Sequence, residues 1–311
     1  MPQSFGNIRD FDLIVLGEVL AEFTCENDIT NSSTFRRDIG GSDLYVAAAA
    51  ARLGSGVRFV SAIGRDPFES FIRDRLISQG INVDYITTCE GSNGIYFLAD
   101  SRTEERDYLY NRPGSAATHI GPASIFDTLV ESAKILYASS ELQSSSKSAR
   151  QAVFKAFNMA HTAGVMVAYD PNLRLQRWTL DDAKEVMWSV LPLIDVIFPS
   201  APHESKALFG YERPLDVIGF MWDHDIETVV VKNGANGCLV GYDKHIEEFA
   251  VPELAKPFIY PSLAGSAFNG GFLHSIARGN DPFTAAQTAI RVASYKGMNG
   301  NGIVSLPQKE S

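Results

Sequence analysis

The sequence is poor in cysteine and has fewer basic than acidic residues. Its 311 residues include three cysteines, Cys25, Cys89 and Cys238, which are far apart and odd in number. They fit neither a disulfide framework nor a CxxC metal pair, which favours a reducing compartment. The 27 Lys and Arg residues are outnumbered by 37 Asp and Glu residues, which gives a formal charge of −10. Because a negative surface repels phosphate backbones, we expect no nucleic acid as a partner.

Long hydrophobic runs are also missing. The most apolar stretches, residues 46–53 and 163–169, fall far short of the ~20 residues that span a bilayer. The first twelve residues carry Arg9, Asp10 and Asp12 and have no apolar block behind a basic start, so we expect no secretory signal. These features predict a cytoplasmic protein with no membrane partner.

Short apolar runs rich in β-branched residues alternate with helical stretches along most of the chain. The runs are apolar throughout, as strands that are covered on both faces require. This alternation predicts an α/β fold with a mostly parallel sheet. The expected strands are residues 11–16, 57–62, 134–138, 165–169, 196–199 and 228–232. The expected helices are residues 45–53, 67–79, 147–162, 180–190, 215–224, 264–277 and 282–298.

Two regions depart from this alternation. Residues 94–100 and 106–110 are strand-like and are joined by a polar stretch, which predicts a hairpin. With residues 21–25 and 35–39 it would form a small separate sheet. Residues 233–237 contain two Asn-Gly pairs, which are typical of tight turns, and therefore predict a second hairpin. We expect one domain over residues 11–307, with lid strands within about 20–39 and 94–111 and flexible ends at 1–10 and 308–311.

Four segments rich in small residues are informative as a set. Gly40-Gly41-Ser42 leads into an alanine-rich helix, and residues 64–68 hold a turn with Asp66 and a helix-starting proline. Residues 170–174 (DPNLR) follow a predicted strand, at the edge where α/β sheets place ligands. Residues 262–272 (SLAGSAFNGGF) open a helix, whose free N–H groups and positive dipole end favour an anion.

In that order and spacing, the four segments resemble the ribokinase-type (PfkB) sugar kinases over nearly the whole chain. Residues 110–117 and 170–174 are most similar to the 2-keto-3-deoxygluconate kinase and fructokinase branch. The resemblance implies a ribokinase-like three-layer α/β/α domain whose cleft is covered by a small β-sheet lid, often used in dimer contacts. It also implies transfer of the γ-phosphate of ATP, with Mg²⁺, to a hydroxyl of a small sugar or sugar acid.

The resemblance further implies roles for individual residues. Ala264, Gly265 and Ser266 form the anion hole, and Glu204 holds the metal through water. The implied sugar contacts are Glu22, Gly40, Gly41, Tyr45, Arg112 and Arg174. The implied nucleotide contacts are Lys232, Gly234, Gly237, Asn269 and Ser294.

The turn that carries the chemistry departs from the family pattern. In-line phosphoryl transfer needs a carboxylate that accepts the hydroxyl proton, and the family supplies it in a Gly-Ala-Gly-Asp turn. Here the turn reads Leu263-Ala264-Gly265-Ser266. A serine hydroxyl has too high a pKa to accept that proton, and Leu263 adds a side chain where phosphate should meet bare backbone. Loss of a general base alone removes ~10²–10⁴-fold in rate, roughly 3–5 kcal/mol of barrier.

Other positions differ from the family pattern as well. Tyr45 stands at the sugar-binding asparagine, and we expect its ring to fill volume that a sugar would occupy. Glu22 is one methylene longer than the family aspartate, and Ala201 replaces the asparagine that helps to organise Mg²⁺. The scaffold is therefore kept, while the groups that activate the hydroxyl and organise the metal are not.

Several alternatives stay open at this stage. Residues 170–172 can simply end a strand, with Asx side chains bonding local amides. Arg112 and Arg174 either clamp a carboxylate or phosphate or form ordinary ion pairs. The motif losses favour a pseudokinase, a protein that binds a sugar, nucleotide or protein partner without efficient transfer. The alternatives are an active sugar or 2-keto-3-deoxygluconate-type kinase with an unusual base, and a structural or assembly protein with an empty cleft.

Overall fold

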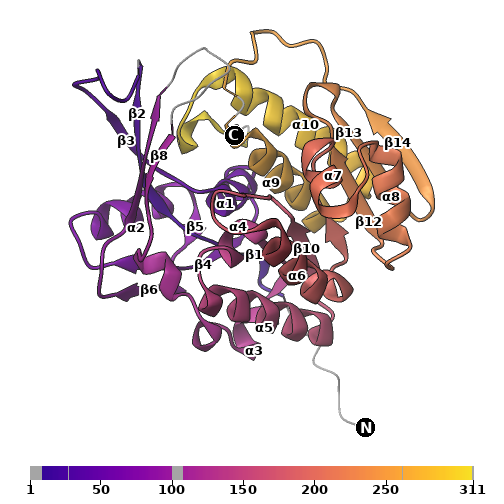
Figure 1. The fold of residues 1–311 in the computed structure, drawn as a ribbon, viewed down its shortest axis with the longest axis horizontal. Coiled ribbons are helices and arrows are strands. Elements are labelled where there is room, and N and C mark those ends of the chain that lie inside the picture. The colour runs from indigo at the N-terminus through magenta and orange to yellow at the C-terminus, as the bar shows by residue number, and fades with distance from the viewer. Residues whose placement is uncertain (1–8, 27, 100–107, 261, 310–311) are drawn as a thin grey trace.

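The computed structural model of the protein describes residues 9–26, 28–99, 108–260 and 262–309. Its centre is a ten-stranded sheet in the order β14-β13-β12-β11-β10-β9-β1-β4-β5, with β6 paired to β4 (Figure 1). The strands from β12 through β5 are parallel, while β13 and β14 add an antiparallel edge beside β12. The bounds are β1 (Phe11–Leu16), β4 (Val57–Gly64), β5 (Ile81–Asn82), β6 (Ile86–Cys89), β9 (Ala133–Ser139), β10 (Met166–Asp170), β11 (Val196–Ile197), β12 (Thr228–Lys232), β13 (Cys238–Tyr242) and β14 (His245–Phe249).

Helices cover both faces of this sheet, so that two hydrophobic cores lie between three layers (Figure 1). One core is covered by α1 (Ser42–Arg52), α2 (Glu69–Ser78), α9 (Ala264–Ala277) and α10 (Pro282–Asn299). The other is covered by α3 (Asp127–Val130), α4 (Ser140–Gln143), α5 (Lys147–Ala163), α6 (Leu180–Val190), α7 (His203–Phe209) and α8 (Pro214–Trp222). The expected α/β/α fold class is confirmed.

Glycine and alanine let α9 pack closely between α1 and α10. Residues 47–50 of α1 are fully buried alanines. A Cβ on Gly270 of α9 would lie 2.5 Å from the carbonyl oxygen of Val46 in α1. Because real Cβ atoms do not approach backbone oxygens that closely, a larger residue would push α9 away. This close packing fixes the N-terminal end of α9 relative to the sheet.

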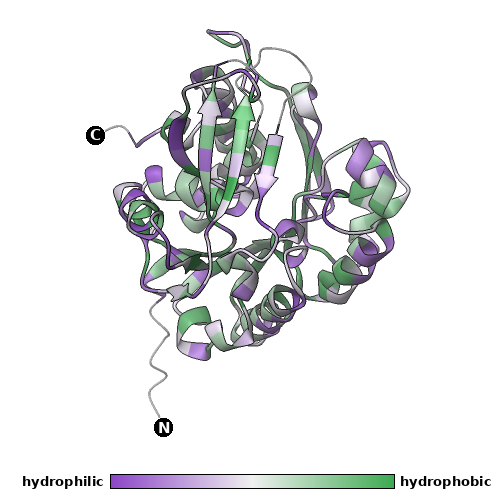
Figure 2. Ribbon diagram, turned by 60° about the vertical axis from the view of Figure 1, so that its left-hand side comes forward, coloured by the Kyte–Doolittle hydropathy of each residue, from purple (hydrophilic) through white to green (hydrophobic). Residues whose placement is uncertain are grey.

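A second sheet of four strands stands out from the main body in Figure 2, in the order β3-β2-β7-β8. Its strands are β2 (Leu20–Cys25), β3 (Arg36–Gly40), β7 (Gly94–Ala99) and β8 (Tyr108–Asn111). The register places Asp38, Glu22, Tyr96 and Tyr110 in one cross-strand row. The adjacent row, Arg37, Phe23, Phe97 and Leu109, faces the opposite side because side chains alternate along a strand. The first row faces the site and the second faces outward.

The sequence placed most elements but not all of them. All six expected core strands are present, and the expected helix at residues 45–53 begins earlier, at Ser42. The short elements α7, β5, β6 and β14 were not expected. The loop expected at residues 101–105 and most of the expected flexible ends lie outside the described residues. No helix within the described ranges is both long and apolar enough to cross a membrane.

Candidate functional site

Two adjoining cavities lie at the carboxyl ends of the parallel strands. The helix-side cavity, of about 580 Å³, is lined by residues 170, 172–176, 200, 201, 203, 204, 207, 232, 263, 265 and 266. The lid-side cavity, of about 1000 Å³, lies between the small sheet and the main body. Arg174, Gln176 and Leu263 line both cavities, so the two spaces meet at these side chains.

The N-terminus of α9 forms one wall of the helix-side cavity. Leu263 caps this helix without a side-chain hydrogen bond and has φ of 59°, in the left-handed region. That conformation costs a residue other than glycine about 1–2 kcal/mol. Leu263 therefore adopts the left-handed conformation that glycine favours, at the position where the family pattern has glycine. The first N–H groups of α9 have no acceptor within the helix, and Gly265 and Ser266 of this turn line the cavity.

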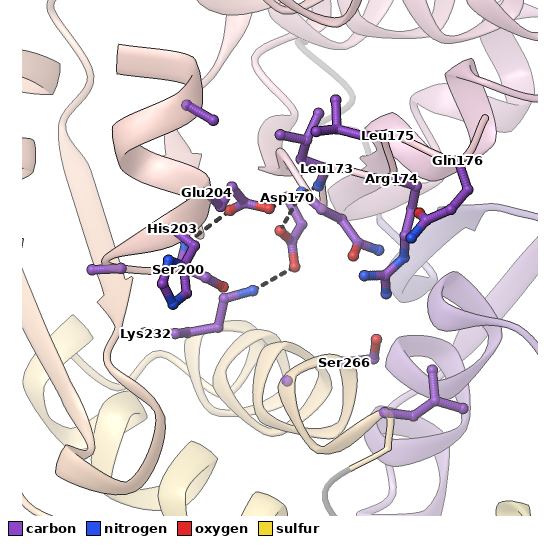
Figure 3. A pocket seen from close by; sticks show the side chains of 15 residues that line it. Asp170, Leu173, Arg174, Leu175, Gln176, Ser200, His203, Glu204, Lys232 and Ser266 are labelled. Atoms are coloured by element: carbon purple, nitrogen blue, oxygen red, sulfur yellow. Dashed lines mark hydrogen bonds and ion pairs between the residues drawn. The ribbon is translucent and has the colours of Figure 1, made fainter. Parts of the chain in front are cut away.

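Ser266 lies in the first turn of α9 and is 8% exposed. Its hydroxyl has no hydrogen-bond partner among the described residues, and in Figure 3 it points into the helix-side cavity. A Cβ on the neighbouring Gly265 would contact only the Lys232 ammonium nitrogen, at 4.0 Å. Packing therefore does not demand a glycine at 265, and the missing side chain leaves the wall open to the cavity.

Asp170 ends β10 and binds three groups at the bottom of the same cavity. It accepts hydrogen bonds from the Lys232 ammonium at 2.6 Å, the Asn269 amide at 2.7 Å and the backbone N–H of Asn172 at 2.9 Å. The structure thus brings together Asp170, Lys232 and Asn269, which belong to β10, β12 and α9. The Asx interpretation of residues 170–172 is compatible with this arrangement, because the amide of Asn172 does bond Asp170. The Asp170–Lys232 pair carries no net charge.

Glu204 holds the loop after β10 against α7. Its two oxygens accept hydrogen bonds from the backbone N–H groups of Ser200 at 2.8 Å and Leu173 at 2.7 Å. Burial, together with the nearby Asp170 carboxylate, raises the pKa of Glu204. Within the described part of the chain, no three His, Cys, Asp or Glu side chains gather in a way that could hold a metal ion.

Three arginines and two glutamates form a buried charge cluster at the junction of the cavities. Arg112 contacts Glu18 at 3.1 Å and Glu141 at 3.0 Å, and Arg177 makes two 3.0 Å hydrogen bonds to Glu18. Arg174 lies 3.5 Å from Glu141, and its side chain is 45% exposed. Burial alone would raise the pKa of Glu141, but the three guanidinium groups outweigh it and lower the pKa to about 2.

The cluster therefore carries one excess positive charge, and Arg174 has the most accessible guanidinium in it. Arg112 and Arg174 were expected from the sequence. Arg177, Glu18 and Glu141 were missed, although Glu18 lies two residues after the end of β1 and Glu141 two residues after the end of β9. The ends of parallel strands meet at one edge, so their position was the available signal.

The structure corrects two of the expected sugar contacts. Tyr45 is 1% exposed, belongs to the hydrophobic core and does not line the lid-side cavity. The expectation that its ring narrows the cleft is wrong, because α1 turns this side chain into the core and a large cavity is open beside Gly41. Glu22 is 1% exposed and is likewise absent from the wall.

Glu22 instead belongs to the cavity-facing row of the small sheet, below its surface. Its carboxylate accepts hydrogen bonds from the Tyr96 hydroxyl and, at 3.2 Å, from the Thr24 hydroxyl. Burial, opposed by these bonds but reinforced by Asp38, raises the pKa of Glu22 to about 7. Tyr96 stands between Glu22 and the cavity and itself lines the wall.

The remaining expected residues divide between the cavities and the scaffold. Gly41 lines the lid-side cavity; it has φ of 135°, and a Cβ there would lie 2.5 Å from the Glu18 carbonyl oxygen. Gly40 makes room for the Tyr96 ring. Gly234, Gly237 and Ser294 do not line either cavity, and the first two shape the turn between β12 and β13.

A stack of tyrosines on the small sheet was not expected. The rings of Tyr96 and Tyr110 stack with centroids 5.5 Å apart, and those of Tyr108 and Tyr110 with centroids 5.8 Å apart. All three line the lid-side cavity. The Tyr108 hydroxyl also contacts the Ser262 hydroxyl, so the small sheet touches the segment that leads into α9. The alternation of tyrosines in β8 was the sequence signal for this wall.

The family model of pfkB family carbohydrate kinases matches residues 10–309. The chain therefore belongs to the pfkB family of carbohydrate kinases, which confirms the resemblance carried by the four small-residue segments.

Several relatives match along nearly their whole length. The chain is 25% identical over 302 residues to an ATP-dependent 6-phosphofructokinase of Thermoanaerobacterium thermosaccharolyticum, covering 96% of this chain and 92% of the relative. It is 25% identical over 306 residues to a 2-dehydro-3-deoxygalactonokinase of Haloferax volcanii, covering 96% and 95%. A solved structure of a Xylella fastidiosa fructokinase with bound ATP superposes with a TM-score of 0.83 at 23% identity, covering 95% of each chain. The last comparison concerns the fold alone.

Proposed function

We propose that this pfkB-family protein binds a small sugar acid in the lid-side cavity and transfers phosphate inefficiently or not at all. The observation that carries the proposal is Ser266 at the head of α9, where transfer needs a carboxylate. A ligand-binding or regulatory pseudokinase role follows from it.

The other carboxylates of the two cavities support this reading because each is already engaged. Among the described lining residues these are Asp170, Glu141 and Glu204. Asp170 is paired with Lys232, and Glu141 is surrounded by arginines that hold its pKa to about 2. Glu204 directs both oxygens to backbone amides. A base must be free to accept the hydroxyl proton in the reacting geometry, and none of these groups is placed to do so.

The preference for a sugar acid rests on the charge of the cluster. Arginine binds carboxylates well because its planar guanidinium presents paired donors. Arg174 is the accessible member of a cluster with one excess positive charge, and it lines the lid-side cavity. The tyrosine stack supplies an apolar wall for the carbon chain of the ligand. The relative named 2-dehydro-3-deoxygalactonokinase is compatible with a ligand of this class.

The residues of the helix-side cavity suit ATP better than they suit Mg²⁺. The open wall at Gly265, the free N–H groups of α9 and Lys232 suit the phosphates of ATP, which would supply the transferable group. The metal is supported less well, because Ala201 offers no ligand and the oxygens of Glu204 face backbone amides. We propose that ATP binds in the helix-side cavity and that the chain does little to organise a metal there.

We also propose that the protein forms a homodimer through the outward face of the small sheet. Phe23 and Phe35 each contact Phe97 on that face, and Leu109 is 54% exposed. α2 covers part of it, since Phe68 packs on Phe23 and Arg37 lies over Phe71. The uncovered part is an apolar surface that a second copy of the chain would bury.

Isothermal titration tests the proposed function. Gluconate and ATP should each bind the wild-type protein, and Arg174→Ala should weaken gluconate binding by about tenfold. Lys155→Ala is the matched control, because its ammonium bonds Pro122 and Ile125 far from the cavities. If neither gluconate nor ATP binds, the empty-cleft alternative is supported and the proposal is contradicted.

A further inference from the structure

We infer that Arg177 makes the lid-side cavity selective for an acid, because it occupies Glu18 and so leaves the charge of Arg174 available to a ligand. This inference rests on the proposed function, since it takes the bound molecule to be a small sugar acid. Arg177 is then a positioning residue, which acts through Glu18 and sets the kind of ligand that the cavity prefers.

Arg177 reaches the charge cluster from the loop that follows β10. Its backbone N–H donates to the carbonyl oxygen of Arg174 at 2.9 Å, which closes a turn, and both residues line the lid-side cavity. The next residue, Trp178, is buried in the core that α5 and α6 help to cover. The turn is therefore anchored on its carboxyl side. The Arg177 side chain, which is 13% exposed, is held beside Glu18.

Arg177 satisfies both oxygens of Glu18. Its two terminal nitrogens donate to the two carboxylate oxygens at 3.0 Å each, in the paired geometry that suits arginine and a carboxylate. Glu18 is 4% exposed, and a buried carboxylate is unfavourable unless a cation pairs with it. Among the described residues, the one other cation that bonds Glu18 is Arg112, at 3.1 Å. Glu18 is thus neutralised without any contribution from Arg174.

Glu141 also has partners apart from Arg174. Its oxygens accept hydrogen bonds from the Arg112 guanidinium at 3.0 Å and from the Ser42 hydroxyl at 2.7 Å. Arg174 lies 3.5 Å from the same carboxylate, and this is the one ion pair that its guanidinium forms with a described residue. Its side chain is 45% exposed, against 11% for Arg112. The charge of Arg174 is therefore the one left for the carboxylate of a ligand.

The net charge of the cluster depends on Arg177. With it, three guanidinium groups face two carboxylates, which leaves one positive charge. Without it, the remaining groups would sum to zero, and Glu141 would hold Arg174 more strongly. The nearby Asp43 carboxyl adds no charge, because burial raises its pKa well above the usual range. A cavity without Arg177 would bind an uncharged polyol as well as a sugar acid.

Calorimetric titration with gluconate and with gluconamide, its uncharged amide, tests this role. The wild-type protein should bind gluconate at least about tenfold more tightly than gluconamide. Arg177→Met should reduce the ratio of the two affinities to about one, because the cluster becomes neutral. Arg213→Met is the matched control, since it breaks an exposed ion pair with Asp216 and lines neither cavity.

Substitution of Glu18 separates an effect of charge from a loss of structure. Glu18→Gln adds one positive charge to the cluster and should raise the preference for gluconate by about a further tenfold. The double variant Arg177→Met/Glu18→Gln has the wild-type charge and should restore the wild-type preference. A purely structural role for Arg177 predicts the opposite, because each change removes bonds from the cluster. If Arg177→Met does not fold, a lowered preference in Glu18→Gln overturns the inference.

The outcomes separate this inference from the proposed function. An unchanged preference in Arg177→Met, or a lost preference that the double variant does not restore, would overturn the role of Arg177 while the proposed function stands. If the wild-type protein binds neither gluconate nor gluconamide, the proposed function fails and this inference fails with it. A preference that is lost in Arg177→Met and restored in the double variant would support the inference.

Discussion

Glu22 carries the clearest pH dependence of any single residue in the site region. Its pKa is raised from 4.5 to about 7, so as pH rises the unfolded chain loses this proton before the folded protein does. The free energy of unfolding therefore falls as pH rises through that window, by on the order of 3 kcal/mol.

Glu22→Gln should remove this dependence, because glutamine cannot ionise. Urea denaturation near pH 4.5 and near pH 8 should show the variant gaining on the order of 3 kcal/mol relative to wild type at the higher pH. Glu185→Gln, at an exposed position of α6, is the control. A difference between Glu22→Gln and wild type that is the same at both pH values would contradict the raised pKa.

Arg112 and Arg174 illustrate how two residues of one charge cluster can differ in role. The Arg112 side chain is 11% exposed and bonds both Glu18 and Glu141, whereas Arg174 is 45% exposed. Arg112→Ala should lower the free energy of unfolding by about 3–5 kcal/mol, because it leaves buried carboxylates short of a partner. Arg174→Ala should change stability by less than about 1 kcal/mol. Equal losses in thermal and urea denaturation would refute this division.

The sequence predicted the head of α9 well because the evidence there is local. Small residues, a helix start and the missing aspartate all lie within a few positions. The surroundings of Tyr45 and Glu22 were mispredicted because they depend on how α1 and β2 are rotated against their neighbours. The residues that surround Tyr45 and Glu22 in the sequence do not reveal that rotation. It is set by the packing of α9 and by the register of the small sheet.

At the scale of elements, a buried lysine joins two loops beside the site. Lys296 of α10 is 0% exposed, and its ammonium donates to the backbone carbonyl oxygens of Tyr260 at 3.1 Å and Gly300 at 3.0 Å. Tyr260 lies just before the segment that leads into α9. The lysine therefore holds that segment against the end of α10.

Lys296→Met should lower the free energy of unfolding by about 1–3 kcal/mol, since the carbonyl groups lose a charged donor. It should also weaken phosphate binding at α9, because the preceding segment loses its attachment. Urea denaturation and phosphate titration measure the two effects, with exposed Lys256→Met as the control. An unchanged free energy of unfolding in Lys296→Met would show that the bonds from Lys296 to Tyr260 and Gly300 do not stabilise the fold.

The positions of the strands were predicted more securely than the short elements between them. The buried runs of the parallel sheet are long and uniformly apolar, so their pattern is distinct. β5 has two residues, and α7 has seven. Elements of this length carry too few positions for a period to be recognised, which is why α7, with Glu204 on it, was not expected.

At the scale of the whole molecule, the proposed dimer follows from the two-sided character of the small sheet. One side faces the cavity with tyrosines, and the other exposes part of an apolar row that includes Leu109. Analytical ultracentrifugation should find a dimer for wild type and a monomer for Leu109→Asp. Leu175→Asp, at a similarly exposed leucine outside this face, should remain dimeric. A wild-type monomer at all concentrations would contradict the proposed interface.

The central claim is that the turn of residues 263–266 no longer supports efficient phosphoryl transfer. The most direct measurement is ADP release by the wild-type protein, with saturating ATP and Mg²⁺, across a panel of sugars and sugar acids. The account predicts a rate at background, little gain in Ser266→Asp because Leu263 still crowds the turn, and a larger gain when Leu263→Gly is added. Wild-type turnover in the range of about 1–10³ s⁻¹ that is typical of enzymes would contradict it.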